Sequence, residues 1–147
     1  DWLIAALNKS YAPFKMVALG GQFLNDVAKH ENMANYPERQ EIIDRIEEEH
    51  IHGVIFLTGD RHCTDMSRLE LEGGAVIHDL TVSPLTSGAY DNSKENNTLR
   101  IEGTTTPQRN FAELNFSGPR KDRSCEIVIK DNEGVELWSK VLKSKEL

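Results

Sequence analysis

The chain has 147 residues, about the length of one domain; 38% of them are hydrophobic and 28% are charged. Its formal net charge is −7, whereas proteins that bind nucleic-acid backbones usually carry a basic surplus, so the sequence shows no nucleic-acid-binding signature. It contains no apolar run of about 18 residues that would predict a membrane span, and its start lacks the features of a signal peptide. Cys63 and Cys125 allow one disulfide at most.

The first elements predict a helix and a strand. Apolar residues at positions 2, 3, 6 and 7 fall on one helical face, and this helix begins at the first residue without a capping residue. A short apolar run at 14–19, ended by two glycines, is typical of a buried strand. Residues 22–35 are polar and are interpreted as a loop.

A second helix and strand follow. Pro37 suits the first turn of a helix, and Ile42, Ile43 and Ile46 mark one buried stripe that Gly53 is expected to end. Residues 54–57 form a second continuous apolar run. Strand, helix and strand in this order predict a parallel pair, with the helix over 37–50 as the crossover.

The second half of the chain predicts antiparallel strands. Residues 69–72 and 75–82 flank two glycines as in a hairpin, and 83–97 is a loop rich in Ser, Asn and Gly. Alternating patterns at 111–116 and 125–130 predict two strands, and a turn then leads to a last strand at 135–141. The fold class is therefore α/β with α+β character in the second half. We expect a single partial domain over 1–147, with a βαβ half over 1–62 and mainly antiparallel strands over 63–147.

The motif with the clearest chemistry is Gly59-Asp60-Arg61-His62, directly after the buried strand 54–57. Parallel sheets place their sites at the carboxyl ends of strands. Asp60 and His62 are two residues apart, so on extended backbone they project to the same side and offer an oxygen and a nitrogen ligand. As a bare four-residue pattern this is more often a surface turn than a metal site.

The surroundings of this motif carry a family resemblance. The shared stretches, in chain order, are residues 2–3, 14–15, 21–22, 36–39, 53–62, 79–88, 97–100, 109–111 and 116–119. The stretch Gly53-Val54-Ile55-Phe56-Leu57-Thr58-Gly59-Asp60-Arg61-His62 is the specific one, and it is followed by Asp79-Leu80-Thr81-Val82-Ser83-Pro84-Leu85-Thr86-Ser87-Gly88. In this order they resemble the C-terminal part of the alkaline phosphatase D (PhoD-like) phosphatases, over most of the chain.

The resemblance implies the C-terminal half of a calcineurin-like metallophosphatase, a β-sandwich flanked by helices. It implies hydrolysis of a phosphate-ester substrate at a two-metal site of divalent or trivalent ions, of which Ca, Fe, Mg, Mn and Zn are candidates. The last metal motif of that superfamily is Gly-His-x-His. Asp60 therefore stands at the first ligand position and His62 at the second, and Gln22 stands where an earlier motif has a histidine. The metal candidates are thus Asp60, His62 and Gln22, and the catalytic candidates are Arg61 and His62.

The sequence departs from the superfamily pattern in one important respect. The earlier motifs Gly-Asp-x-x-Asp and Gly-Asn-His are absent, and the earlier Asp-x-His motif is missing too, because the Asp60-Arg61-His62 triplet belongs to the later motif and cannot double for it. We therefore expect the chain to supply only part of the metal site and to be inactive alone, with the remaining ligands coming from a missing N-terminal segment or a second chain. Apolar surface around the first helix and strand should receive that partner. The family implies a periplasmic or secreted protein. The alternative function is a non-catalytic binding or assembly module.

Several polar residues have more than one interpretation. Arg61 either faces the phosphate or pairs with a nearby carboxylate. Cys63 either ligates a soft metal or fills a small buried space, and the second is favoured. His78 either orients a ligand from behind or is simply packed, and Ser83, Thr86 and Ser87 are candidates for the mouth of the site. The remaining histidines are interpreted as surface residues: His30, His50 and His52.

Overall fold

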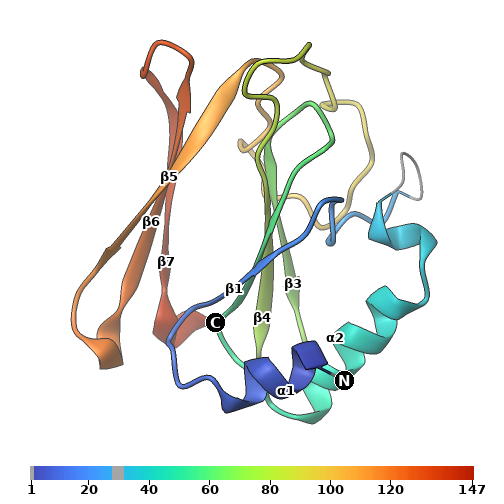
Figure 1. The fold of residues 1–147 in the computed structure, drawn as a ribbon, viewed down its shortest axis with the longest axis vertical. Helices are drawn as coiled ribbons and strands as arrows, with labels where there is room; N and C mark the ends of the chain where they lie inside the picture. The colour runs from blue at the N-terminus through green and yellow to red at the C-terminus, as the bar shows by residue number, and fades with distance from the viewer. Residues whose placement is uncertain (1, 28–31) are drawn as a thin grey trace.

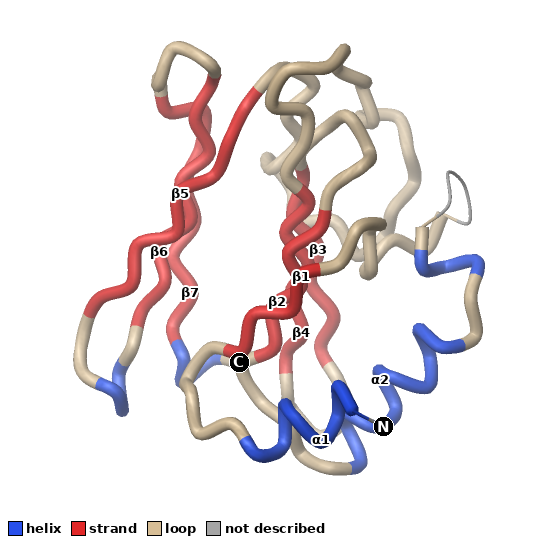
Figure 2. The backbone as a smooth tube through the Cα atoms, viewed as in Figure 1, coloured by secondary structure: helices blue, strands red, loops and turns tan. Residues whose placement is uncertain are grey.

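The computed structural model describes residues 2–27 and 32–147, which form three layers: two helices, a four-stranded sheet and a three-stranded sheet (Figure 1). The helices cover one face of the four-stranded sheet, and the three-stranded sheet lies against its other face (Figure 2). The main elements in chain order are α1 (Trp2–Lys9), β1 (Lys15–Ala18), α2 (Glu38–Glu48), β2 (Val54–Thr58), β3 (Asp65–Glu70), β4 (Val76–Thr81), β5 (Asn110–Ser117), β6 (Ser124–Asp131) and β7 (Glu136–Lys143).

The first sheet has the strand order β1-β2-β4-β3. β1 and β2 are parallel, with Met16 opposite Ile55, and α2 is the crossover between them, as the sequence predicts. β4 is also parallel to β2, whereas β3 runs antiparallel to β4 and forms the first arm of the predicted hairpin. The hairpin strand begins at Asp65 rather than at Leu69, because its first half pairs with the buried end of β4.

β1 differs from its prediction as a fully buried strand. It lies at the edge of the sheet and is half-buried, because only β2 pairs with it. The loop after it was predicted to be polar, yet Phe23 and Leu24 are fully buried in it. The ring of Phe23 stacks on Phe56 of β2 with centroids 3.7 Å apart, so this loop contributes to the core.

The end of α2 also differs from its prediction. The helix stops at Glu48, five residues before the glycine that was expected to end it. His50 has a φ of 51°, and Ile51 N donates to Ile46 O, which is the bond pattern of a Schellman motif. Gly53 has a different role just before β2: a Cβ at this position would collide with the backbone carbonyl of Pro13, so only glycine fits there.

Two apolar cores result from the layers. The first lies between the helices and the first sheet and includes Ile4, Ile46 and Ile77. The second lies between the two sheets and includes Ile55, Leu80 and Ile127. The two cores remove the apolar side chains on both faces of the parallel strands from water. Parallel strands require this, because their side chains are apolar on both faces. The predicted fold class, a sandwich flanked by helices, is confirmed.

The second sheet is antiparallel with the order β5-β6-β7, as predicted. Its inner side chains alternate with outer ones, and Ile127 and Ile129 point into the second core while Glu126 is exposed. Cys125 is buried in the same core and is free, as is Cys63.

An apolar groove of about 400 Å³ runs between α1 and the outer side of β1. It is lined by Leu3, Ala6 and Val17, among others, and Trp2 at its end is 82% exposed. The inward face of α1 is formed by Ile4 and Leu7, so part of the predicted apolar stripe faces outward instead. None of the helices within the described residues is long and apolar enough to cross a membrane.

Candidate functional site

The carboxyl ends of β1, β2 and β4 lie at one edge of the first sheet, because these three strands are parallel. Gln22 follows β1, residues 59–62 follow β2, and Ser83 follows β4. β3 runs in the opposite direction, so its first residue, Asp65, starts at the same edge. The loops in the upper part of Figure 1 therefore gather the polar residues of four segments.

The backbone of residues 59–62 turns sharply. Asp60 and His62 have positive φ values of 67° and 56°, and Arg61 N donates to Gly59 O at 2.8 Å, so Asp60 is the centre of a γ-turn. The expected extended backbone is wrong here, because the chain must cross over the end of β4 to reach β3. Such conformations cost about 1–3 kcal/mol each and persist where the surroundings hold them, often at functional sites.

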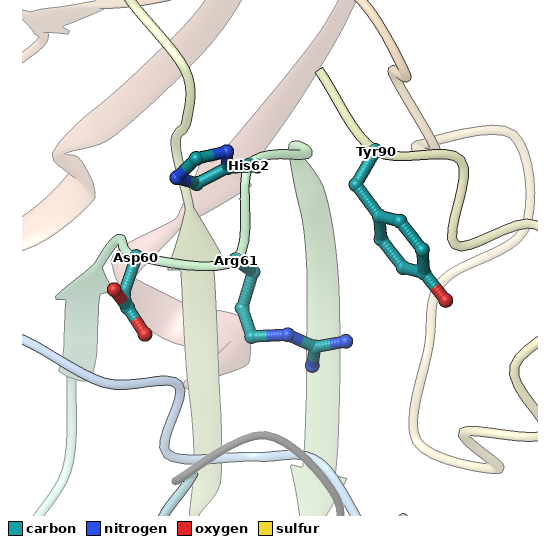
Figure 3. Close-up of a pocket in the computed structure, with 4 residues that line it drawn as sticks. All are labelled: Asp60, Arg61, His62 and Tyr90. Carbon is teal, nitrogen blue, oxygen red and sulfur yellow. The ribbon is translucent and has the colours of Figure 1, made fainter. Parts of the chain in front are cut away.

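Asp60 and His62 are exposed and line one pocket of about 250 Å³, together with Arg61 and Tyr90 (Figure 3). His62 N donates to Ser83 Oγ at 3.1 Å, and His62 O accepts from Tyr90 N at 2.6 Å. The loop after β4 therefore holds the turn from its outer side. Among the described residues, neither the carboxylate of Asp60 nor the ring of His62 makes a hydrogen bond or an ion pair.

The side chain of Arg61 points inward, away from the His62 ring (Figure 3). It is 3% exposed, and its guanidinium donates to Gln22 Oε1 at 2.6 Å and to the carboxylate of Glu95. The structure thus shows the second interpretation of Arg61, pairing with a carboxylate. Burial leaves this group little surface to offer to a substrate.

Gln22 is also buried, and both the nitrogen and the oxygen of its side-chain amide are engaged in hydrogen bonds. Its nitrogen donates to Asp65 Oδ1 at 2.8 Å and to Thr81 Oγ at 2.9 Å, and its oxygen accepts from Asn25 as well as from Arg61. The oxygen would have to release these bonds before it could bind a metal ion. Gln22 therefore lies at the predicted edge, behind the exposed turn.

Two further residues at this edge belong to the same network. Asp65 is fully buried and accepts from Asn92 Nδ2 at 2.8 Å and from Arg100 Nε at 2.9 Å, in addition to Gln22. Sequence reasoning missed Asp65 and Glu95. Nothing distinguishes Glu95 from the other polar residues of its loop, and Asp65 precedes the part of β3 that has a recognisable strand pattern.

Asp79 supports the site from within β4. Its Oδ2 accepts from the backbone nitrogens of Phe23 and Leu24, both at 2.7 Å, and its Oδ1 accepts from Thr58 Oγ at 2.7 Å. Burial raises the pKa of Asp79 to about 6, although these hydrogen bonds oppose the shift. No role was assigned to Asp79 from the sequence. A carboxylate inside a predicted buried strand is the signal that could have revealed it, since isolated buried charges are rare.

The other candidates lie away from the pocket or are inert. Burial, with the nearby carboxylate of Asp65, raises the pKa of Cys63 to about 12, so its thiol stays neutral and fits the buried-filler interpretation. His78 is packed in the interior. His50 and His52 are exposed, as predicted, and His30 lies outside the described residues.

The side chains that the structure describes do not form a complete metal site. Within residues 2–27 and 32–147, no group of three or more His, Cys, Asp and Glu side chains is placed to hold a metal ion. The donors that fit a metal are Asp60 and His62, which supply a carboxylate and an imidazole at one pocket. Closed sites usually have about four ligands, so further donors are required.

Comparisons with known proteins identify the family and the fold of the chain. The family model described as PhoD-like phosphatase matches residues 1–126. This chain belongs to the PhoD-like phosphatase family. A solved structure titled "Structure of PhoD" has a TM-score of 0.68 and 16% sequence identity, and the match covers 97% of this chain and 30% of that one. The PhoD-like chain therefore spans about a third of the length of that structure and shares its fold. None of the curated proteins matches it.

Proposed function

We propose that this chain supplies part of a metal-dependent phosphatase centre that hydrolyses phosphate esters. Membership of the PhoD-like family supports the reaction class. The observation that carries the proposal is the turn after β2, where Asp60 and His62 both have positive φ and both face one pocket. Two ligand-type side chains held in costly backbone conformations at a strand end are typical of a functional site.

Asp60 and His62 would hold the metal through a carboxylate oxygen and a ring nitrogen. Metal ions, when bound, offset the charge of the phosphoryl oxygens and lower the pKa of the attacking water. The backbone of His62 is fixed by Ser83 and Tyr90, so its ring starts from a defined position. The phenol ring of Tyr90 forms another wall of the same pocket, where an ester group would lie.

The test compares two double variants in a longer protein that includes the rest of the family's chain. Asp60→Asn with His62→Asn removes both donors but keeps residues that tolerate positive φ. Asp44→Asn with His50→Asn is the matched control, because both residues are exposed on or after α2 and His50 has a φ of 51°. Metal content is measured by elemental analysis, and activity with p-nitrophenyl phosphate and bis-p-nitrophenyl phosphate.

We expect the site variant to lose bound metal and at least about 100-fold in kcat/KM, and the control to keep both. Unchanged metal content and activity in the site variant would show that the assignment of Asp60 and His62 is wrong. A wild-type protein without bound metal or hydrolysis would instead favour a non-catalytic binding or assembly module.

We further propose that the groove between α1 and β1 receives the segment or second chain that supplies the missing ligands. β1 pairs on one side only, the groove is apolar, and the chain spans 30% of the solved PhoD structure. Ala5 and Ala6 are both exposed on α1, but only Ala6 lines this groove. Ala6→Arg in the longer protein should therefore reduce metal content and activity, and Ala5→Arg should not. Equal effects of the two variants would refute the proposal.

A further inference from the structure

A buried ion pair lies directly behind the exposed turn. Arg61, between the two candidate ligands, pairs with Glu95 from the loop after β4, and the two side chains are 3% and 9% exposed. Charged groups in such a place are costly unless each is paired and hydrogen-bonded. Arg61 meets this condition through a planar guanidinium that reaches Gln22 and Glu95 at once.

The pair belongs to a larger network in which arginines and carboxylates alternate. Arg100 donates to Asp65 at 2.9 Å, and its guanidinium also lies 3.9 Å from Glu95. Gln22 connects the two halves, because it donates to Asp65 and accepts from Arg61. Two arginines therefore balance two carboxylates in the interior, and each group has a partner on another segment of the chain.

The network joins the segments that surround the turn. Gln22 comes after β1, Arg61 after β2, Asp65 at the start of β3, and Glu95 and Arg100 from the long loop after β4. The side chain of Arg61 is therefore fixed on the inner side, while the backbone on either side of it adopts positive φ. Because the side chain of Arg61 is held on the inner side, the side chains of its neighbours Asp60 and His62 face the solvent.

We propose that Arg61 and Glu95 are positioning residues, whose ion pair holds the strained 59–62 turn so that Asp60 and His62 are presented together. The inference rests on the proposed function only where it concerns metal affinity. Positioning partners behind ligands commonly change affinity without touching the ion themselves. An ion pair that served stability alone would behave differently: its loss would lower the stability of the fold without loosening this turn in particular.

The first measurement needs no metal. Hydrogen exchange, followed by mass spectrometry on the longer protein, reports on peptides that cover residues 59–64 and 88–92. Glu95→Gln removes the charge but keeps the shape, and Arg61→Lys keeps the charge but loses the fork that reaches both partners. We expect either variant to speed exchange in both peptides by roughly tenfold, because the amides of Arg61, His62 and Tyr90 are bonded within this turn and its neighbour.

Two controls separate positioning from stability. Glu113→Gln breaks the 2.8 Å pair with Lys130 in the second sheet, far from the turn, and should leave exchange in both peptides unchanged. Ile127→Val makes a small cavity in the second core and lowers the midpoint of thermal unfolding without contacting the network. Its effect on these two peptides should be no larger than its effect on the rest of the first sheet.

The second measurement is Zn²⁺ affinity, by calorimetric titration of protein stripped with chelator. Glu95→Gln and Arg61→Lys should weaken binding by about 10- to 100-fold, and the double variant by no more than the worse single one, since both act through one pair. Faster exchange with unchanged Zn²⁺ affinity would support the positioning role of the ion pair and refute Asp60 and His62 as ligands. Exchange that stays at the wild-type rate in both variants would overturn the inference.

Discussion

His78 and Asp79 follow one another on β4 but face opposite cores, and burial moves their pKa values in opposite directions. Asp79 shares its face with Ile77 and the helices, while His78 shares the other with Leu80 and the second sheet. Burial disfavours the charged form of each, so the pKa of Asp79 rises to about 6 and that of His78 falls to about 4. Both changes affect stability between about pH 4 and pH 6.5.

Replacing Asp79 should remove its contribution to the pH dependence of stability. Its folded pKa of about 6 lies above the ordinary 3.8, so the folded state holds the proton more tightly, and stability from this group is lost as the pH rises from about 4 to 6. In Asp79→Asn the amide oxygen still accepts from Phe23 and Leu24. Urea unfolding should show that the variant gains up to about 3 kcal/mol relative to wild type between pH 4 and pH 7. A constant difference across this range would contradict the assignment.

Replacing His78 should give the opposite pH dependence. Its folded pKa of about 4 lies below the ordinary 6.5, so the unfolded chain takes up a proton first, and stability is lost as the pH falls from about 6.5 to 4. His78→Gln has no titrating group at this position. As the pH falls through this range, its free energy of unfolding should therefore rise relative to that of the wild type, by up to about 3 kcal/mol. His50→Gln is the control, because His50 is exposed on the surface. Parallel curves for wild type and His78→Gln would show that the pKa of His78 is the same in the folded and the unfolded state, and would contradict the prediction.

Two glycines with positive φ should differ sharply in their tolerance of alanine. A Cβ on Gly53, where φ is 75°, would lie 2.2 Å from the carbonyl oxygen of Pro13, whereas a Cβ on Gly74, where φ is 85°, meets no atom within 4 Å. We expect Gly74→Ala to cost about 1 kcal/mol of unfolding free energy and Gly53→Ala about 3 kcal/mol or more. Chemical denaturation of both variants gives the comparison. Equal costs would mean that strand β2 can move away from Pro13 without penalty.

The two thiols should be unreactive while the protein is folded. Burial raises the pKa of Cys63 to about 12 and that of Cys125 to about 11, and the reactive thiolate is therefore scarce at pH 8. Ellman's reagent should modify both residues roughly 100-fold or more slowly than in urea-unfolded protein. Cys63→Ser should leave the slow rate of Cys125 unchanged, since the two are free and separate. Rapid labelling of the native protein would mean that Cys63 is a reactive thiol beside the site.

The sequence predicted the parts of this fold that depend on local periodicity. The apolar run before Gly59 specified an interior strand, and the stripe of Ile42, Ile43 and Ile46 specified the crossover helix, because burial of one face requires that spacing. It also placed Asp60 and His62 at a strand end. These conclusions need only the order of elements and the rule that parallel strands share a carboxyl edge.

The sequence did not reveal which residues stand behind the site. Phe23 and Leu24 lie in a segment whose composition is mostly polar, and their burial depends on Asp79, more than fifty residues later, accepting their backbone amides. Hydrogen bonds between distant loops have no periodic signal, because the partner is selected by how the chain returns to the same edge.

The conformation of the turn itself was decided only by the tertiary structure. From the sequence, a phosphate and a carboxylate were equally favoured as the partner of Arg61. Asp60 and His62 were predicted to have extended backbone. The sheet order forces the chain across the end of β4, and the loop that follows β4 brings Glu95 to within bonding distance of Arg61. The chemistry of the motif was thus set by residue type and position. The direction of each side chain was set by a buried charge that had to be paired, and that pairing is a property of the whole fold.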